Sequence, residues 1–171
     1  AGLSDKSKAD AILAQTKKVI REKWSQDEAF YGKFSELVEN LLNKLKSAKR
    51  EDLAALLEQA KQYQADVANY SDADIPETLR SKQVFHPFYR NIKGFCKTTG
   101  DEYADIVRHI VALVQSKKVV DFQTRDDVKR AVLNDVEDFL FDEVDEKLSA
   151  DTIEQIALTV WNLAVENKDL F

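Results

Sequence analysis

The sequence contains little of what interrupts helices, crosslinks chains or crosses membranes. Its 171 residues include four glycines, two prolines, one cysteine and no methionine. Because glycine and proline break helices, their scarcity favours helices throughout and argues against a sheet-rich fold. The single Cys96 cannot form an internal disulfide, which fits a reducing compartment, and we expect a cytoplasmic protein. No apolar run approaches the roughly 20 residues that cross a bilayer, and no signal peptide opens the chain, so we predict no membrane partner.

The length and the remaining composition predict an all-α fold. A chain of 171 residues suits one domain with a substantial core, and 33% of its residues are charged. We expect a single irregular bundle of about six to eight helices over residues 1–171, with little or no sheet and with helix groups at about 4–70 and 76–171. Since even position 1 lacks methionine, we expect an excised piece of a longer polypeptide.

The net charge of −6 conceals a division along the chain. Residues 76–130 carry 11 basic and 7 acidic side chains, whereas residues 131–171 carry 2 basic and 11 acidic ones. The average argues against a nucleic-acid binder with a wholly basic surface. A basic middle followed by an acidic tail predicts two surfaces with different partners.

Helical periodicity predicts three helices in the first 70 residues. Ser4 or Ser7 is expected to cap the first helix, whose polar side is basic, and Asp27 the second. The basic side fits a solvated face better than a nucleic-acid contact. A third helix from about Asp52 to Tyr70 follows a short connection, so we expect it to form an antiparallel hairpin with the second.

The segment from Pro76 to Gly100 mixes aromatic and basic side chains. Pro76 is expected to begin one short helix, and Pro87 the next. The interleaved cations can contact a nucleic-acid backbone, or they can be the charged ends of side chains that cover core aromatics. These cations are Arg80, Lys82, Arg90, Lys93 and Lys97. The loop KGFCKTTGDE lacks a glycine immediately before its Lys-Thr pair, so it does not match a nucleotide-binding P-loop.

The stretch from Val119 to Leu140 combines an extended entry, a helix cap and basic charge. Phe122 lies in a β-branched and aromatic run, and Thr124 is predicted to cap the helix that follows. Further cations lie around this cap: Lys117, Lys118, Arg125, Lys129 and Arg130. An acidic linker comes next, with Asp142, Glu143, Asp145 and Glu146. Ser149 then caps a last helix, in which Trp161 is expected to anchor the core.

Three strings in the chain resemble one known family. They are VDFQTRDDVKRAV at 120–132, DEAFYGKFSELVE at 27–39 and EYADIVRHIVALV at 102–114. The first looks like the V-D-(W/F)-x-x-R-x-x-V-(R/K) string in the C-terminal helical region of the motor (R) subunit of type I restriction enzymes. The others look like earlier helices of that region, and together the resemblance covers about two-thirds of the chain.

The resemblance implies a non-catalytic assembly domain in a DNA-translocating endonuclease. In that family the motor subunit joins a methyltransferase core made of modification and specificity subunits, and it moves and cleaves double-stranded DNA with ATP and Mg²⁺. Those cofactors would belong to the parent chain and not to this segment. The charge division fits this role: the ten cations named above are candidates for backbone contacts with DNA, and the four acids at 142–146, which DNA would repel, are candidates for a protein partner.

The residues themselves offer no catalytic or metal constellation. Glu102, Asp105 and His109 can share part of a helix face, but no Glu-x-x-His pair of a helical metal site occurs. We therefore expect no catalytic residue and no metal. Two alternatives stay open: an all-helical adaptor that binds only proteins, and a small enzyme in which Asp105, His109 and Cys96 converge in one cleft.

Overall fold

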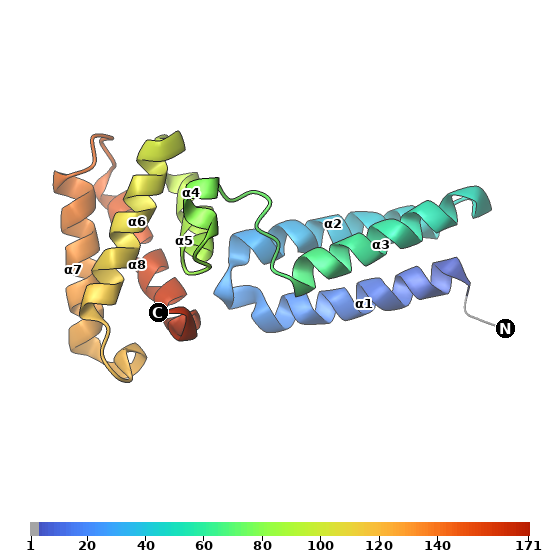
Figure 1. Cartoon of the computed structure of the whole chain (residues 1–171), viewed down its shortest axis with the longest axis horizontal. Helices are drawn as coiled ribbons and strands as arrows, with labels where there is room; N and C mark the ends of the chain where they lie inside the picture. The colour runs from blue at the N-terminus through green and yellow to red at the C-terminus, as the bar shows by residue number, and fades with distance from the viewer. Residues whose placement is uncertain (1–3) are drawn as a thin grey trace. The chain divides into compact units, whose positions relative to one another are not determined.

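The computed structural model describes residues 4–171, and the chain divides into two compact units (Figure 1). One unit comprises the residues up to Trp24 together with Glu28–Ala73; the other comprises Ser25–Asp27 and Asp74–Phe171. Within the described range there are eight α-helices and five short 3-10 helices, and no strand, which confirms the all-α prediction. Each unit has its own apolar core.

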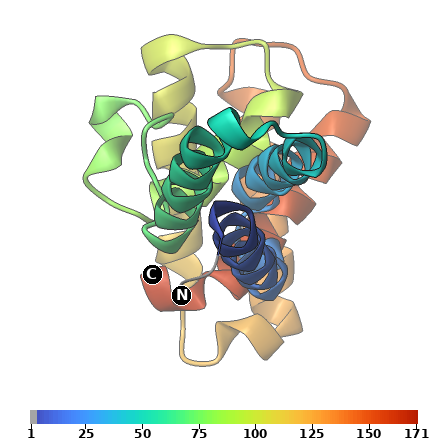
Figure 2. The same cartoon turned by 90° about the vertical axis from the view of Figure 1, so that its right-hand side faces the viewer.

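The first unit is a three-helix bundle of α1 (Asp5–Lys23), α2 (Glu28–Lys46) and α3 (Leu53–Ala68). Each helix contacts the other two, and Figure 2 shows all three nearly end-on. Ser4 caps α1 as predicted, since its hydroxyl accepts a hydrogen bond from the Ser7 amide at 3.2 Å. The core follows the predicted apolar stripes and includes Leu13, Ile20, Phe30, Phe34, Val38, Leu41 and Leu45.

The second unit is built from three long helices and two short ones. The long helices are α6 (Gly100–Lys117), α7 (Asp126–Asp142) and α8 (Ala150–Glu166); the short ones are α4 (Glu77–Arg80) and α5 (Phe85–Ile92). Helix α7 contacts both α6 and α8, and α5 also contacts both α6 and α8. Ser149 caps α8 as predicted, by accepting a hydrogen bond from the Thr152 amide at 3.1 Å.

Aromatic side chains fill much of the second core. Trp161 is 5% exposed and meets Phe122 edge-on, with ring centroids 5.9 Å apart, which confirms its predicted role as a core anchor. Tyr103 is buried on α6, and its hydroxyl donates to the backbone carbonyl of Tyr89 at 2.6 Å. Burial raises the pKa of the Tyr103 hydroxyl above its usual range, so it stays protonated. The ring of Phe171 packs edge-on against Phe88.

The entry to α7 differs from the prediction. Thr124 does not cap the helix: it belongs to a 3-10 turn (Phe122–Thr124), and its hydroxyl donates to the Asp121 carbonyl at 3.0 Å. Asp121 has a left-handed backbone with φ of 56°, so the chain turns here and does not run extended. Arg125 occupies the N-cap position instead, and its side chain makes no cap hydrogen bond.

The two prolines lie close to helix starts but not at the first helical position, whereas Gly100 is the first residue of its helix. Pro76 is the N-cap of α4 and not its first residue, while Pro87 is the third residue of α5. Gly100 is the first residue of α6 and has φ of +65°, a conformation that glycine adopts without strain.

Candidate functional site

The five cations predicted from the 80–97 segment differ in their exposure and in their contacts. Lys82 and Lys97 are exposed. Arg80 is also exposed, but its Nε and Nη2 donate to the Ile75 carbonyl at 3.1 and 2.8 Å, so its guanidinium closes the turn before α4. Lys93 lies with its Nζ 5.4 Å from the centre of the Tyr89 ring. The Lys93 contact matches the alternative in which the cations cover aromatic side chains.

Arg90 is removed from the predicted DNA-contacting set because it is buried. Its side chain is 4% exposed, and Nη1 donates to the Asp27 carboxylate at 2.9 Å. Its Nε and Nη2 donate to both oxygens of Asp74 at 3.0 and 2.9 Å. Asn91 donates to the other Asp27 oxygen at 2.7 Å. The guanidinium therefore serves to hold the Ser25–Asp27 segment and Asp74 within the second unit.

Three of the five cations around the α7 entry lie beside acidic or carbonyl oxygens. Lys117 pairs with Asp135 at 3.5 Å, and the Lys118 ammonium donates to the carbonyl of Phe171. Arg125 pairs with Asp127 at 2.6 Å, which raises the pKa of the guanidinium and lowers that of the carboxyl. Two further cations complete the set: Lys129 is half-buried and Arg130 is exposed.

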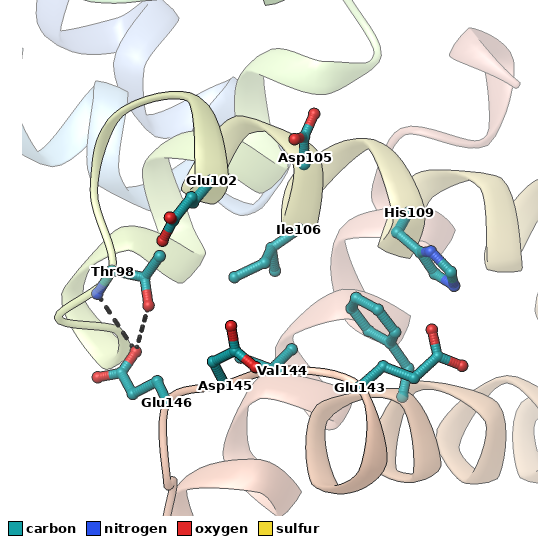
Figure 3. Close-up of a pocket in the computed structure, with 10 residues that line it drawn as sticks. Thr98, Glu102, Asp105, Ile106, His109, Glu143, Val144, Asp145 and Glu146 are labelled. Atoms are coloured by element: carbon teal, nitrogen blue, oxygen red, sulfur yellow. Dashed lines mark hydrogen bonds between the residues drawn. The ribbon is translucent and has the colours of Figure 1, made fainter.

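The acidic linker, by contrast, contributes to a pocket. A cavity of about 310 Å³ lies between α6 and the segment that joins α7 to α8 (Figure 3). Three of the four predicted partner-binding acids line it: Glu143, Asp145 and Glu146. The fourth, Asp142, ends α7, is exposed and does not line the cavity. Helix α6 adds two more carboxylates to the lining, Glu102 and Asp105.

The floor of this pocket is apolar and aromatic. Ile106, Phe139 and Val144 line it, each 8% exposed. The His109 ring lies flat on the Phe139 ring, with centroids 3.9 Å apart and an interplanar angle of 6°. Figure 3 shows Ile106 and His109 pointing from α6 toward the opposite wall, whereas Asp105 points away from it. Asp105 also pairs with Arg108, so it neutralises a cation at the edge.

Glu146 has a structural task that the sequence did not reveal. Its carboxylate accepts hydrogen bonds from the Lys97 amide at 2.7 Å, the Thr98 amide at 3.2 Å and the Thr98 hydroxyl at 2.9 Å. Burial alone would raise the pKa of this carboxyl, but the hydrogen bonds outweigh it and the pKa is lowered. Glu146 thus fixes the loop before α6 against the acidic linker, and Glu102, Glu143 and Asp145 remain as the acids around the cavity.

The lining of the pocket is strongly acidic. Its ten described lining residues include five carboxylates and neither lysine nor arginine. An ammonium or guanidinium group can pair with the acids while its aliphatic stem lies on the apolar floor. Electrostatic attraction of this kind is strengthened by partial burial.

The structure does not bring together the three residues of the small-enzyme alternative. Asp105 and His109 both line the pocket, but Cys96 does not. Burial, together with the Glu146 charge, raises the pKa of the Cys96 thiol to about 11, so very little of it is thiolate at neutral pH. In residues 4–171 no group of three or more metal-ligating side chains is arranged to hold a metal ion.

The sequence predicted only part of the α6 side of the pocket. The spacing of Glu102, Asp105 and His109 placed them on one helix face, but it did not show what that face opposes. Their meeting with the acidic linker depends on how α6 packs against α7, and no local signal encodes it.

Comparison with protein-family models, with curated proteins and with solved structures gives no match for this chain. Among residues 4–171, no helix combines the length and apolar character that a membrane span requires.

Proposed function

We propose that this chain is a non-catalytic docking domain: the C-terminal helical domain of a type I restriction enzyme motor subunit, which assembles with the methyltransferase core in the cytoplasm. The observation that carries the docking role is the acid-lined pocket with an apolar floor, which suits a lysine or arginine side chain on a partner surface. The family assignment is supported by the VDFQTRDDVKRAV string and its two companions. ATP and Mg²⁺ would act elsewhere in the parent chain.

The partners under this proposal are the modification and specificity subunits and double-stranded DNA. The modification and specificity subunits would present the basic side chain to Glu102, Glu143 and Asp145. DNA would be contacted through phosphates by the exposed cations, without reading sequence. The exposed members of the predicted set are Arg80, Lys82, Lys93, Lys97, Lys117, Lys118, Arg125 and Arg130.

A protein-only adaptor is the second candidate, and one observation favours it. Lys117, Lys118 and Arg125 each have an oxygen partner within the second unit, which reduces the charge they present. Helix α7 also opens with Asp126 and Asp127, so the region around its N-terminus is not uniformly basic. In this alternative the acidic pocket has the same role, and DNA contact is absent.

The docking role is tested by reversing the charge at the pocket. We expect Glu143→Lys/Asp145→Lys to weaken assembly with the modification and specificity subunits at least tenfold in sedimentation velocity, because a cation would then meet a cation. The matched control, Glu36→Lys/Glu51→Lys, reverses two acids of the first unit that lie far from the pocket in sequence and should assemble normally. Equal assembly of both variants would overturn the pocket as the docking site.

The DNA role is tested with labelled duplex at several salt concentrations. Under the motor-subunit proposal, reversing Lys117, Lys118, Arg125, Lys129 and Arg130 to Glu should weaken binding. It should also flatten the dependence of log K on log salt, by roughly 0.9 for each phosphate that the chain no longer neutralises. A control with the same charge change reverses five cations of α1: Lys6, Lys8, Lys18, Arg21 and Lys23. The adaptor alternative predicts no duplex binding by the unaltered chain even at low salt.

A further inference from the structure

A second surface of the same unit has the features of a helix-binding groove. Helices α7 and α8 lie against each other, and a cavity of about 460 Å³ opens between them. Each helix contributes one face: Glu137, Asp138 and Phe141 come from α7, and Ala150, Ile153 and Glu154 come from α8. The lining covers about one turn at the end of α7 and one turn at the start of α8, so on each helix it forms a single face.

Phe141 is the main apolar feature of this groove. It is 74% exposed, whereas Phe139, two residues earlier, is 8% exposed. On α8, Leu158 is 39% exposed and lies one helical turn beyond Glu154, on the same side of the helix. An exposed aromatic ring beside a concave surface is typical of a protein-binding hot spot.

The charges around the groove indicate what covers it. Glu137, Asp138 and Glu154 are acidic, and none of the six described lining residues is basic. Asp142 and Asp151, which follow Phe141 and Ala150 in the chain, are also exposed acids. A second copy of this chain in a two-fold dimer would place these carboxylates opposite one another, which is repulsive. The charge complement is a basic partner.

We propose that the α7–α8 groove binds a basic amphipathic helix of a protein partner, with Phe141 as the central apolar contact. Apolar side chains at three- and four-residue spacing fill the groove beside Phe141, Ile153 and Leu158, and lysines or arginines on the flanks of that helix pair with Glu137, Asp138 and Glu154. The inference rests on the proposed docking function, and it assigns a surface separate from the α6 pocket.

The test uses the complete 171-residue chain and a synthetic helical peptide of about 18 residues, or five turns. The probe carries leucine at positions i, i+3, i+4 and i+7 and lysine on the flanks. One control peptide has the same composition with the leucine stripe rearranged, and another has glutamate in place of lysine. Binding is measured by fluorescence anisotropy at about 50 and about 300 mM salt, where screening differs.

We expect the striped lysine peptide to bind at least tenfold more tightly than either control peptide. Phe141→Ala should weaken it about tenfold, in line with the removal of one buried aromatic side chain from the interface. Glu154→Lys should weaken it and reduce the salt dependence. Val120→Ala removes an apolar side chain that is 85% exposed outside the groove, and it should change nothing.

Three results would overturn the groove proposal. They are equal binding of the striped and rearranged peptides, equal affinity of the Phe141→Ala and Val120→Ala chains, or a dimer of the chain that Phe141→Ala dissociates. The docking function has its own readout in the pocket variants at Glu143 and Asp145. If these abolish assembly while Phe141→Ala alters neither assembly nor peptide binding, the docking function stands and the groove is wrong.

Discussion

Replacing Arg90 with methionine should destabilise the second unit strongly. The Arg90 guanidinium donates one hydrogen bond to Asp27 and two to Asp74, at distances between 2.9 and 3.0 Å. Asp27 is completely buried and lies 63 positions away in the chain, so the interaction joins distant segments. Methionine fills a similar volume without charge, and the buried carboxylate loses its cation.

The expected size follows from the burial of both groups. A buried ion pair adds little relative to a well-packed apolar substitute, but removing one partner leaves an uncompensated charge, which costs about 3–5 kcal/mol. For a chain of this length each kcal/mol moves Tm by about 2–4 °C, so we expect Tm to fall by about 6–20 °C. Arg90→Lys keeps the charge but not the planar donor geometry, and its Tm should lie between those of the unaltered chain and Arg90→Met.

Thermal unfolding can be followed by the fluorescence of Trp161, which is buried in the second unit. A Trp24→Phe background removes the other tryptophan. The matched control is Arg125→Met, which applies the same substitution to an exposed ion pair with Asp127 and should leave Tm unchanged. If Arg90→Met and Arg125→Met unfold at the same temperature, the reasoning from burial is refuted.

Three further predictions concern the contacts beside the pocket. Glu146→Ala should speed amide exchange at Lys97 and Thr98 at least tenfold by NMR. In the unaltered chain the pKa of Glu146 is lowered by folding, so its stabilisation is present above the ordinary value of 4.5 and is lost as pH falls through the folded pKa. Protection of the two amides that persists at pH 2 would contradict this. Cys96, with its pKa raised from 9.0 to about 11, should react with a disulfide reagent at pH 8 roughly a hundredfold more slowly than a free cysteine, and a normal rate would show that the thiol is not buried as described. Ser149→Ala should lower the free energy of unfolding by about 1 kcal/mol in urea titration while Ser149→Asp, which keeps an N-cap acceptor, should not; equal losses would rule out the cap.

The helices could be predicted because their signals are local. Few glycines and prolines, apolar positions at helical spacing, and serine caps at Ser4 and Ser149 all act within one or two turns. The failure at Thr124 has a local cause as well. Its hydroxyl is engaged with the carbonyl of Asp121, whose left-handed backbone no residue pattern indicated, since aspartate adopts this conformation far less often than glycine.

The tertiary placement of charged side chains was beyond local reasoning. Arg90 lies among aromatic residues in the sequence and was predicted to contact DNA from the surface. In the structure it is buried, because Asp27 and Asp74 accept its hydrogen bonds. In the same way, the acidic linker was predicted to face a partner. In the structure its acids line a pocket together with Glu102, and Glu146 holds the loop at Thr98. Both arrangements depend on helix packing. A charge pattern indicates that a side chain needs a counterpart, and only the fold shows which one.

The acids at the end of α7 do not stabilise the helix to which they belong. The C-terminal turn of a helix carries partial negative charge, and lysine or arginine there is stabilising. Helix α7 has no basic residue in its last turn and ends with Asp138 and Asp142. Phe139 faces the α6 pocket and Phe141 the α8 groove, about 200° apart around the helix, so carboxylates flank both. This arrangement disfavours the isolated helix, and a basic partner on either side would supply the positive charge that its sequence omits.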